Sequence, residues 1–309
     1  MPAELILTNA RVVTADRVIN GTLMIRDGVI AALDEGNSQL PQAQDLGGDY
    51  LMPGLVELHT DNLEKHMTPR PGVDWPTASA VLTHDAQIIA AGITTVFDAL
   101  SIGDINPRGK RMQQLPAMLD AVASAEAAGD TRAEHRLHLR CEVCHPDALS
   151  LFRDLVGHPL VKLVSVMDHS PGQRQFARED KYREYYMGKY HLSAAEMDAF
   201  SDQQTANSSQ YSDRQRLAVV EICQARGLAL ASHDDATLAH VEESAGLGMA
   251  IAEFPTTLEA AEASHARGLK VLMGAPNVVR GGSHSGNIAA ADLAQRGVLD
   301  ILSSDYYPA

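Results

Sequence analysis

Cysteine is scarce in this chain and long apolar runs are absent, which excludes two classes of protein. The three cysteines, Cys141, Cys144 and Cys223, are too few and odd in number for a disulfide framework, and they fit a reducing compartment. Polar residues or glycine interrupt every apolar stretch well before the roughly 20 residues that a membrane-spanning helix needs. The N-terminus also lacks the basic region and apolar core of a secretory signal. We therefore expect a cytoplasmic protein without a membrane span.

Positive charge is also in short supply. The chain has 25 Lys and Arg against 40 Asp and Glu, which gives a formal net charge of −15. Such an acidic chain does not suit a nucleic-acid surface. An anionic substrate would need a local group of cations.

The first 50 residues predict a small β domain. Residues 4–33 alternate between apolar and polar positions as short strands do, with turns expected at Asn20-Gly21 and Asp27-Gly28. Residues 35–48 are polar and contain Gly and Pro, as linkers do. We predict that residues 1–52 form this small domain and that residues 53–309 form the second one.

Eight β-rich runs alternate with stretches of helix length in the second domain. Because β-helix-β alternation implies parallel strands, eight such units over about 250 residues predict a (β/α)₈ barrel. The interval 170–211 is too long for one crossover and holds five of the eight tyrosines, so we interpret it as a helical segment inserted over the barrel mouth. The predicted strands are 55–58, 94–97, 137–143, 161–166, 228–232, 249–253, 270–273 and 299–303.

Residues able to bind metal end several of these strands. In a β-strand, side chains at positions i and i+2 point to one face, so His59 and Asp61 can converge on one cation while Thr60 points away. Strands three, four, five and eight also end in His or carboxylate residues, and all strand ends of a barrel share one mouth. The complete set is His59, Asp61, Glu142, His169, His233 and Asp305.

The set predicts two divalent ions rather than one. Three imidazoles and two carboxylates exceed what one tetrahedral ion needs, and Glu142 can bridge two ions. Zn is the expected metal, with Mn and Fe as alternatives that the same ligands tolerate. Since a metal pair lowers the pKa of a shared water, Asp305 would accept its proton and pass it to the leaving group as general acid/base.

The blocks His-Thr-Asp-Asn-Leu-Glu-Lys-His (59–66) and Pro-Arg-Pro-Gly-Val-Asp-Trp-Pro (69–76) are the most specific part of a wider likeness. Together with 137–142, 167–175, 231–235, 253–257 and 273–287, they resemble the amidohydrolase superfamily, with its usual His-x-His replaced by His-x-Asp. Within it, the chain is similar to the α-D-ribose 1-methylphosphonate 5-triphosphate diphosphatase family of the carbon–phosphorus lyase pathway. The resemblance implies a metal-dependent hydrolase acting on a phosphoanhydride, which releases diphosphate and leaves the ribose 5-phosphate.

A polyanionic substrate of this kind requires cations and backbone N–H groups near the mouth. The Gly-rich turn at residues 280–284 follows strand seven, and its N–H groups can point at phosphate oxygens. Other polar residues follow strand one or open the insertion. The substrate-binding candidates are Asn62, Lys65, His66, Arg70, Arg174, Arg178, Asn277, Arg280, Ser283 and His284.

Two other functions stay open at this stage. A hydrolase of cyclic amides or N-acyl groups would use the same metal chemistry, and a catalytically inactive amidohydrolase-like scaffold would act by binding. The sequence also leaves open a homo-oligomer and contacts with other phosphonate-pathway enzymes. Because the family continues beyond strand eight whereas this chain stops at Ala309, we expect an incomplete N-terminal β domain with unpaired strand edges.

Overall fold

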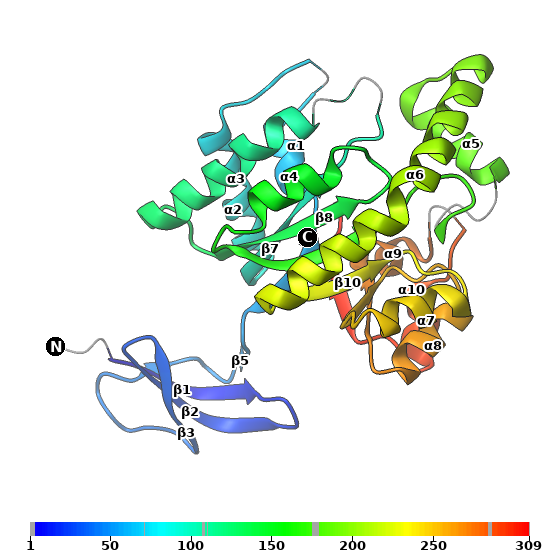
Figure 1. The fold of residues 1–309 in the computed structure, drawn as a ribbon. Helices are drawn as coiled ribbons and strands as arrows, with labels where there is room; N and C mark the ends of the chain where they lie inside the picture. The colour runs from blue at the N-terminus through cyan, green and yellow to red at the C-terminus, as the bar shows by residue number, and fades with distance from the viewer. Residues whose placement is uncertain are drawn as a thin grey trace. The chain divides into compact units, whose positions relative to one another are not determined.

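The computed structural model describes residues 4–70, 72–106, 109, 111–174, 179–283 and 286–308 (Figure 1). The chain divides into two compact units, Met1–Leu55 and Val56–Ala309. Of the residues that the sequence nominates for the site, Arg178 and His284 lie outside the described residues.

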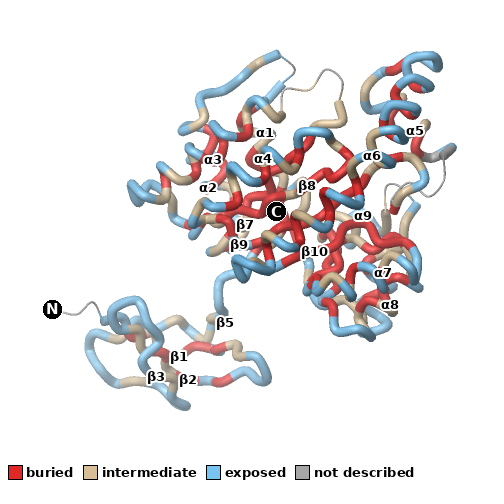
Figure 2. Tube along the Cα trace, in the orientation of Figure 1, coloured by how far each residue is buried: buried red, intermediate tan, exposed pale blue. Residues whose placement is uncertain are grey.

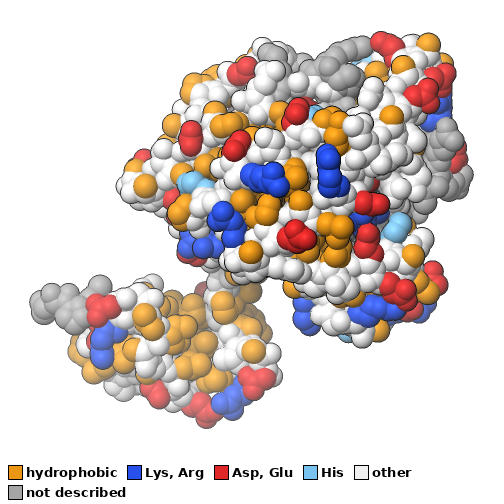
Figure 3. Space-filling view, viewed as in Figure 1, with side chains coloured by type: hydrophobic (Ala, Val, Ile, Leu, Met, Phe, Trp, Pro, Cys, Tyr) orange, Lys and Arg blue, Asp and Glu red, His pale blue; other side chains and the backbone are white. Residues whose placement is uncertain are grey.

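The smaller unit is a five-stranded sheet. Strands β1 (Glu4–Val13), β2 (Val18–Arg26) and β3 (Val29–Glu35) form an antiparallel meander, and β4 (Gln44–Asp45) and β5 (Tyr50–Leu51) pair with β1 in parallel. Apolar side chains are visible on the surface of this unit in Figure 3. Val29 and Ile30 of the edge strand β3 are 67% and 65% exposed.

One of the two predicted hairpin turns is present in this unit and the other is not. Asp27 and Gly28 both have positive φ, as a two-residue turn of type I′ requires. Asn20 and Gly21 instead lie inside β2. A Cβ atom on Gly21 would stand 2.0 Å from the carbonyl oxygen of Asp34, so glycine here serves the close approach of β3 rather than a turn.

The larger unit is built on eight parallel strands that follow one another in sheet order. They confirm the predicted (β/α)₈ barrel. The first and last strands are joined by a bridge between Thr60 and Asp305, which closes the sheet at its carboxyl edge. The strands are β6 (Leu55–Thr60), β7 (Ile93–Ile102), β8 (Glu134–Glu142), β9 (Val161–Met167), β10 (Ala229–His233), β11 (Ile251–Glu253), β12 (Lys270–Gly274) and β13 (Ile301–Ser303).

Helices lie outside the strands, and Figure 2 shows burial concentrated along β7 to β10, with exposed outer helix faces. Apolar residues such as Leu137, Val164 and Leu230 belong to the main core, as expected for strands covered on both faces. No helix in the described part of the chain is long and apolar enough to cross a membrane. The helices are α1 (Asn62–Met67), α2 (Thr77–Ala90), α3 (Arg111–Ala128), α4 (Ala148–Leu155), α5 (Glu179–Tyr190), α6 (Ala194–Arg226), α7 (Leu238–Gly246), α8 (Leu258–Ala266), α9 (Ala275–Arg280) and α10 (Ala290–Gln295).

The long interval between β9 and β10 is largely helical. Helix α6 runs for 33 residues without interruption, from Ala194 to Arg226. A capping box between Ser193 and Glu196 starts it, Gly227 in the left-handed region ends it, and neither Gly nor Pro occurs between. Helix α6 packs against α5 and against the barrel strands β9 and β10.

Candidate active site

A cavity of about 450 Å³ lies at the carboxyl ends of the barrel strands. Its volume is in the range of pockets that hold small molecules. All six residues predicted to share the mouth line this cavity, because the strands are parallel and end at one edge. They are His59, Asp61, Glu142, His169, His233 and Asp305.

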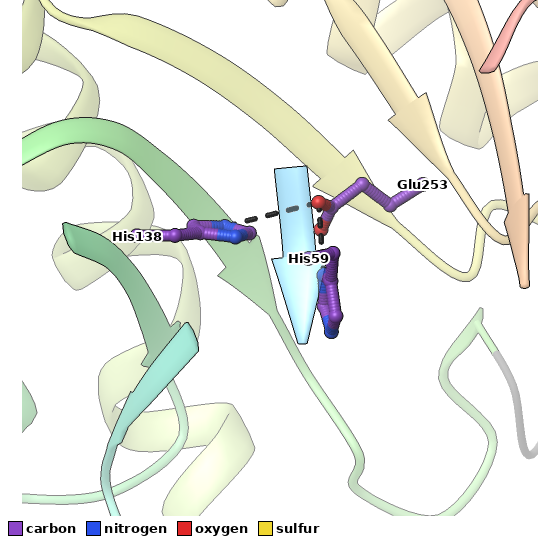
Figure 4. Close-up of side chains that lie close together, drawn as sticks. All are labelled: His59, His138 and Glu253. Carbon is purple, nitrogen blue, oxygen red and sulfur yellow. Dashed lines mark hydrogen bonds and ion pairs between the residues drawn. The ribbon is translucent and has the colours of Figure 1, made fainter. Parts of the chain in front are cut away.

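His59 is completely buried at the end of β6 and presents an unused nitrogen. Its Nδ1 lies 3.0 Å from Oε1 of Glu253, a buried carboxylate at the end of β11 (Figure 4). Its Nε2 is buried and has no hydrogen-bond partner among the residues that the structure describes. A buried polar atom without a partner is costly, so this nitrogen is suited to receive a ligand such as a cation.

Glu142, His169 and Asp234 form a second buried polar group with His233. Oε2 of Glu142 lies 2.5 Å from His169 Nδ1, and Oδ2 of Asp234 lies 3.4 Å from the Nε2 atoms of both His169 and His233. Burial opposes the charges, yet the mutual attraction lowers the pKa of Glu142 to about 2 and raises that of His169 to about 10. This part of the site therefore holds a charged pair at neutral pH.

Asp61 and Asp305 differ in pKa although both lie beside His59. Burial would raise the pKa of Asp61, but the guanidinium of Arg140, whose Nη1 lies 2.7 Å from Asp61 Oδ1, helps to lower it to about 2. Burial raises the pKa of Asp305 to about 6. One carboxylate is thus firmly ionised, and the other titrates close to neutrality, as a general acid/base should.

The donors fit divalent ions in two groups. The ligand atoms of His59, Asp61 and Asp305 all lie within 4.8 Å of one another, and so do those of His169, His233 and Asp234. Imidazole nitrogen and carboxylate oxygen are the donors that Zn, Mn and Fe share. Asp234 was not among the residues predicted from sequence, although it directly follows His233.

Several cationic and neutral polar side chains also line the cavity. Arg280, Asn277 and Ser283 do so as expected from the turn after β12. Sequence reasoning missed three others, Arg111, Arg140 and Lys189. A signal existed for Arg140, because it precedes Glu142 by two residues on β8 and must share its face of the strand.

Of the eight nominated substrate-binding residues that the structure describes, five are not among those lining the cavity. Asn62 is buried and donates to Gln87, and His66 contacts the same glutamine. These two side chains lie against α2 instead of the mouth, because α1 turns back as soon as β6 ends. Lys65 donates to the backbone oxygen of Tyr306, which does line the cavity, and Arg70 forms a local bridge with Val73.

Arg174 is the clearest correction. It is 3% exposed and is ion-paired with Asp235 and Glu243. Asp235 lies in the loop after β10, and Glu243 lies in α7. A guanidinium that satisfies two buried carboxylates stabilises the fold and is not available to a phosphate. Its position at the start of the insertion after β9 suggested a different role, because sequence proximity to a strand end does not set the direction of a loop.

Comparison with known proteins identifies the family. No protein-family model matches the chain. It is 56% identical over 305 residues to the α-D-ribose 1-methylphosphonate 5-triphosphate diphosphatase of Escherichia coli strain K12, covering 99% of this chain and 81% of that protein. The chain belongs to this family. The likeness read from the sequence blocks is confirmed.

More distant proteins match in part of the sequence or in the fold. A D-hydantoinase from Rhizobium radiobacter is 30% identical over 129 residues, which cover 41% of this chain and 26% of that enzyme. The N-acetyl-D-glucosamine-6-phosphate deacetylase of Mycobacterium smegmatis superposes with a TM-score of 0.57 at 15% identity, over 99% of this chain and 71% of that one. The Pasteurella multocida N-acetylglucosamine-6-phosphate deacetylase gives 0.55 at 11% identity, over 97% and 71%. At such identities the structural likeness shows the fold alone.

Proposed function

We propose that this protein hydrolyses α-D-ribose 1-methylphosphonate 5-triphosphate to the 5-phosphate and diphosphate during phosphonate catabolism. The observation that carries the proposal is the 56% identity, over nearly the entire chain, to the E. coli diphosphatase of that name. The cavity supports it chemically, because an acidic protein of net charge −15 concentrates cations there.

The cationic lining favours a polyanion over a neutral cyclic amide. Arg111, Arg140, Lys189 and Arg280 approach the cavity from four different elements, α3, β8, α5 and α9. Arg140 Nε is buried and has no hydrogen-bond partner among the described residues, so a phosphate oxygen would satisfy it. A hydantoin-like ring would leave such groups unpaired in a buried site, which costs binding energy.

We assign two divalent ions to the site, with Zn expected and Mn or Fe as alternatives. His59, Asp61, Glu142, His169 and His233 would hold them, and Asp234 joins this set because it lies between His169 and His233. A bound cation would also displace the proton that His169 carries in its ion pair with Glu142. Bound there, the ions would polarise phosphoryl oxygens and make a water more acidic.

The remaining chemistry belongs to residues of the chain. As the water oxygen bonds to the phosphorus nearest the ribose, Asp305 accepts a proton from that water. The bond from this phosphorus to the diphosphate oxygen breaks, and Asp305 returns the proton to that oxygen. Its pKa of about 6 suits both transfers near neutral pH. Arg140 donates a hydrogen bond from Nη1 to Asp61, and its Nε–H can donate to the phosphoryl oxygen on which negative charge develops.

We also place the protein in the cytoplasm. Its three cysteines are buried free thiols, which supports a reducing compartment. Burial also raises the pKa of Cys144 and Cys223, so neither thiol is activated for reaction.

The decisive experiment follows phosphorus by NMR. The purified chain, loaded with Zn or Mn, should convert the 5-triphosphate to the 5-phosphate with one equivalent of diphosphate, and removal of the metal by a chelator should stop the reaction until metal is restored. Release of single phosphates, or turnover of a hydantoin but not of the triphosphate, would overturn the proposal. Loss of activity in Asp305→Asn at unchanged metal content serves as the control for a contaminating phosphatase.

A further inference from the structure

We propose that Glu253 is a positioning residue that holds both His59 and His233 in the one orientation and tautomer that can bind metal. The proposal rests on the metal site proposed above, and it concerns a residue that is not among those lining the cavity. Glu253 ends β11 and is 1% exposed.

The carboxylate is shared between two imidazoles from different strands. Oε1 lies 3.0 Å from His59 Nδ1, and Oε2 lies 3.2 Å from His233 Nδ1. His233 is the register partner of Glu253 on the adjacent strand β10, whereas His59 comes from β6, further round the barrel. One side chain therefore ties three strands together beneath the cavity.

These contacts determine which nitrogen carries the proton. A carboxylate has no hydrogen to donate, so each Nδ1 must donate to it. An imidazole protonated on Nδ1 carries its lone pair on Nε2, which is the atom of His59 that lacks a partner and the atom of His233 that faces Asp234. Both lone pairs are thus set toward the proposed ions, as partners behind metal-binding histidines generally ensure.

His138 does not compete for this carboxylate, although Figure 4 marks an ion pair between His138 and Glu253. Its Nδ1 lies 3.1 Å from the carbonyl oxygen of Leu58 and its Nε2 lies 2.9 Å from Ser165 Oγ. Because a carbonyl oxygen only accepts, His138 is the Nδ1-protonated form and its Nε2 accepts from the serine. Its 3.8 Å separation from Glu253 is longer than a hydrogen bond. The two donors to Glu253 are therefore His59 and His233.

Replacement of Glu253 by Gln separates this role from simple packing. The amide has nearly the same shape, but it offers one accepting oxygen and one donating NH₂ group. It can accept from only one imidazole and must donate to the other, which would move that ring's proton to Nε2 and remove the lone pair from the cavity. We expect Zn affinity to fall by roughly 10- to 100-fold, the usual effect of losing such a partner.

A matched control exists in another part of the barrel. Asp98 on β7 also contacts two imidazoles, His84 Nε2 and His135 Nδ1, each at 2.7 Å, with all three residues fully buried and none lining the cavity. Asp98→Asn removes the same kind of charge from the same kind of arrangement. It should lower stability and leave Zn affinity within about twofold of the parent.

The test combines ¹⁵N NMR of the histidine rings in metal-free protein with Zn affinity measured by chelator competition. Variants His59→Gln and His233→Gln assign the two ring systems among the 13 histidines. The parent should show Nδ1–H at both rings, and Glu253→Gln should show Nε2–H at one of them together with weaker Zn binding. Two unchanged Nδ1–H rings with unchanged Zn affinity, or equal loss of Zn affinity in Asp98→Asn, would overturn the proposal. Neither readout needs substrate, so a failure of the proposed diphosphatase activity would be seen separately.

Discussion

The backbone of Asp305 is hydrogen-bonded on both sides to the end of the first barrel strand. Its N–H donates to the carbonyl of His59 at 3.0 Å, and its own carbonyl accepts from the N–H of Asp61 at 2.9 Å. The contact that closes the barrel thus sets the last-strand carboxylate directly beside the two first-strand ligands. The same backbone contact therefore closes the sheet and brings these three side chains together.

Replacement of Asp305 by Asn should retain substrate binding and reduce turnover by on the order of 10² or more, the usual scale for losing general acid–base help. Asp305 has a φ of +53°, a conformation that asparagine tolerates, so the backbone bonds to His59 should persist. Diphosphate release measured by phosphorus NMR, with binding measured by calorimetry, checks both expectations.

Asp300→Asn is the matched control for this change. Asp300 precedes β13 and contacts Lys270 and His265, and it is not among the residues that line the cavity. Its substitution should leave turnover near the parent value. Unchanged turnover in Asp305→Asn would remove that residue from the mechanism.

Arg280 should discriminate between polyphosphates and monophosphates. It lines the cavity and is an exposed residue at the end of α9. A charge-assisted bond to phosphate contributes roughly 1.5 to 3 kcal/mol. We therefore expect Arg280→Ala to weaken binding of a triphosphate by about 10- to 150-fold. Monophosphate binding should change far less. Competition binding measures both, with Arg296→Ala, which removes a surface pair with Glu262, as the control. Equal losses for the two ligands would indicate a structural role.

Arg174 should affect stability rather than recognition. Arg174→Ala leaves Asp235 buried and unpaired, and breaking such a pair typically costs about 3 to 5 kcal/mol of unfolding free energy. Arg267→Ala, which removes a surface pair with Glu242, should cost less than about 1 kcal/mol. Urea unfolding of the two variants compares them. A stable Arg174→Ala protein with weakened triphosphate binding would restore the role predicted from sequence.

Because the pKa of Asp98 is lowered in the folded protein, we expect the free energy of unfolding to depend on pH. Burial would raise its pKa, but His84 and His135 lower it from 3.8 to about 2. Because the folded pKa is the lower one, the carboxylate stabilises the fold above about pH 4, by about 2 kcal/mol, and this contribution is lost as the pH falls through about 2. Burial would lower the pKa of His135, but Asp98 raises it in the parent, so His135 is protonated there over this range.

The measurement is urea unfolding of the parent and Asp98→Asn between pH 6 and pH 3. The difference in unfolding free energy should become smaller as the pH falls from about 5 toward 3, because the Asp98 carboxylate of the unfolded parent takes up its proton over this range. A difference that stays constant down to pH 3 would mean that the folded protein does not hold Asp98 with a lowered pKa.

Local pattern was enough to predict the barrel and the six residues at its mouth. Alternation of strand-like and helix-like segments implies parallel strands, and parallel strands present their carboxyl ends together, so His59 and Asp305 could be paired from opposite ends of the sequence. The two-residue period of a strand also placed Asp61 beside His59, and the same rule applied to Arg140 would have found it. These inferences depend only on geometry that repeats along the chain.

Only the tertiary structure decided which charges serve the site and which serve the fold. Arg174 and Arg280 both follow strand ends, yet Arg174 meets Asp235 and Glu243 while Arg280 reaches the cavity, because loop direction depends on partners distant in sequence. Likewise, Glu253 looks like any strand residue until β6 and β10 bring His59 and His233 to its two oxygens. The sequence determines which side chains stand at each strand end. Packing determines which partners each buried charge has, because a charge removed from water needs partners within the folded chain.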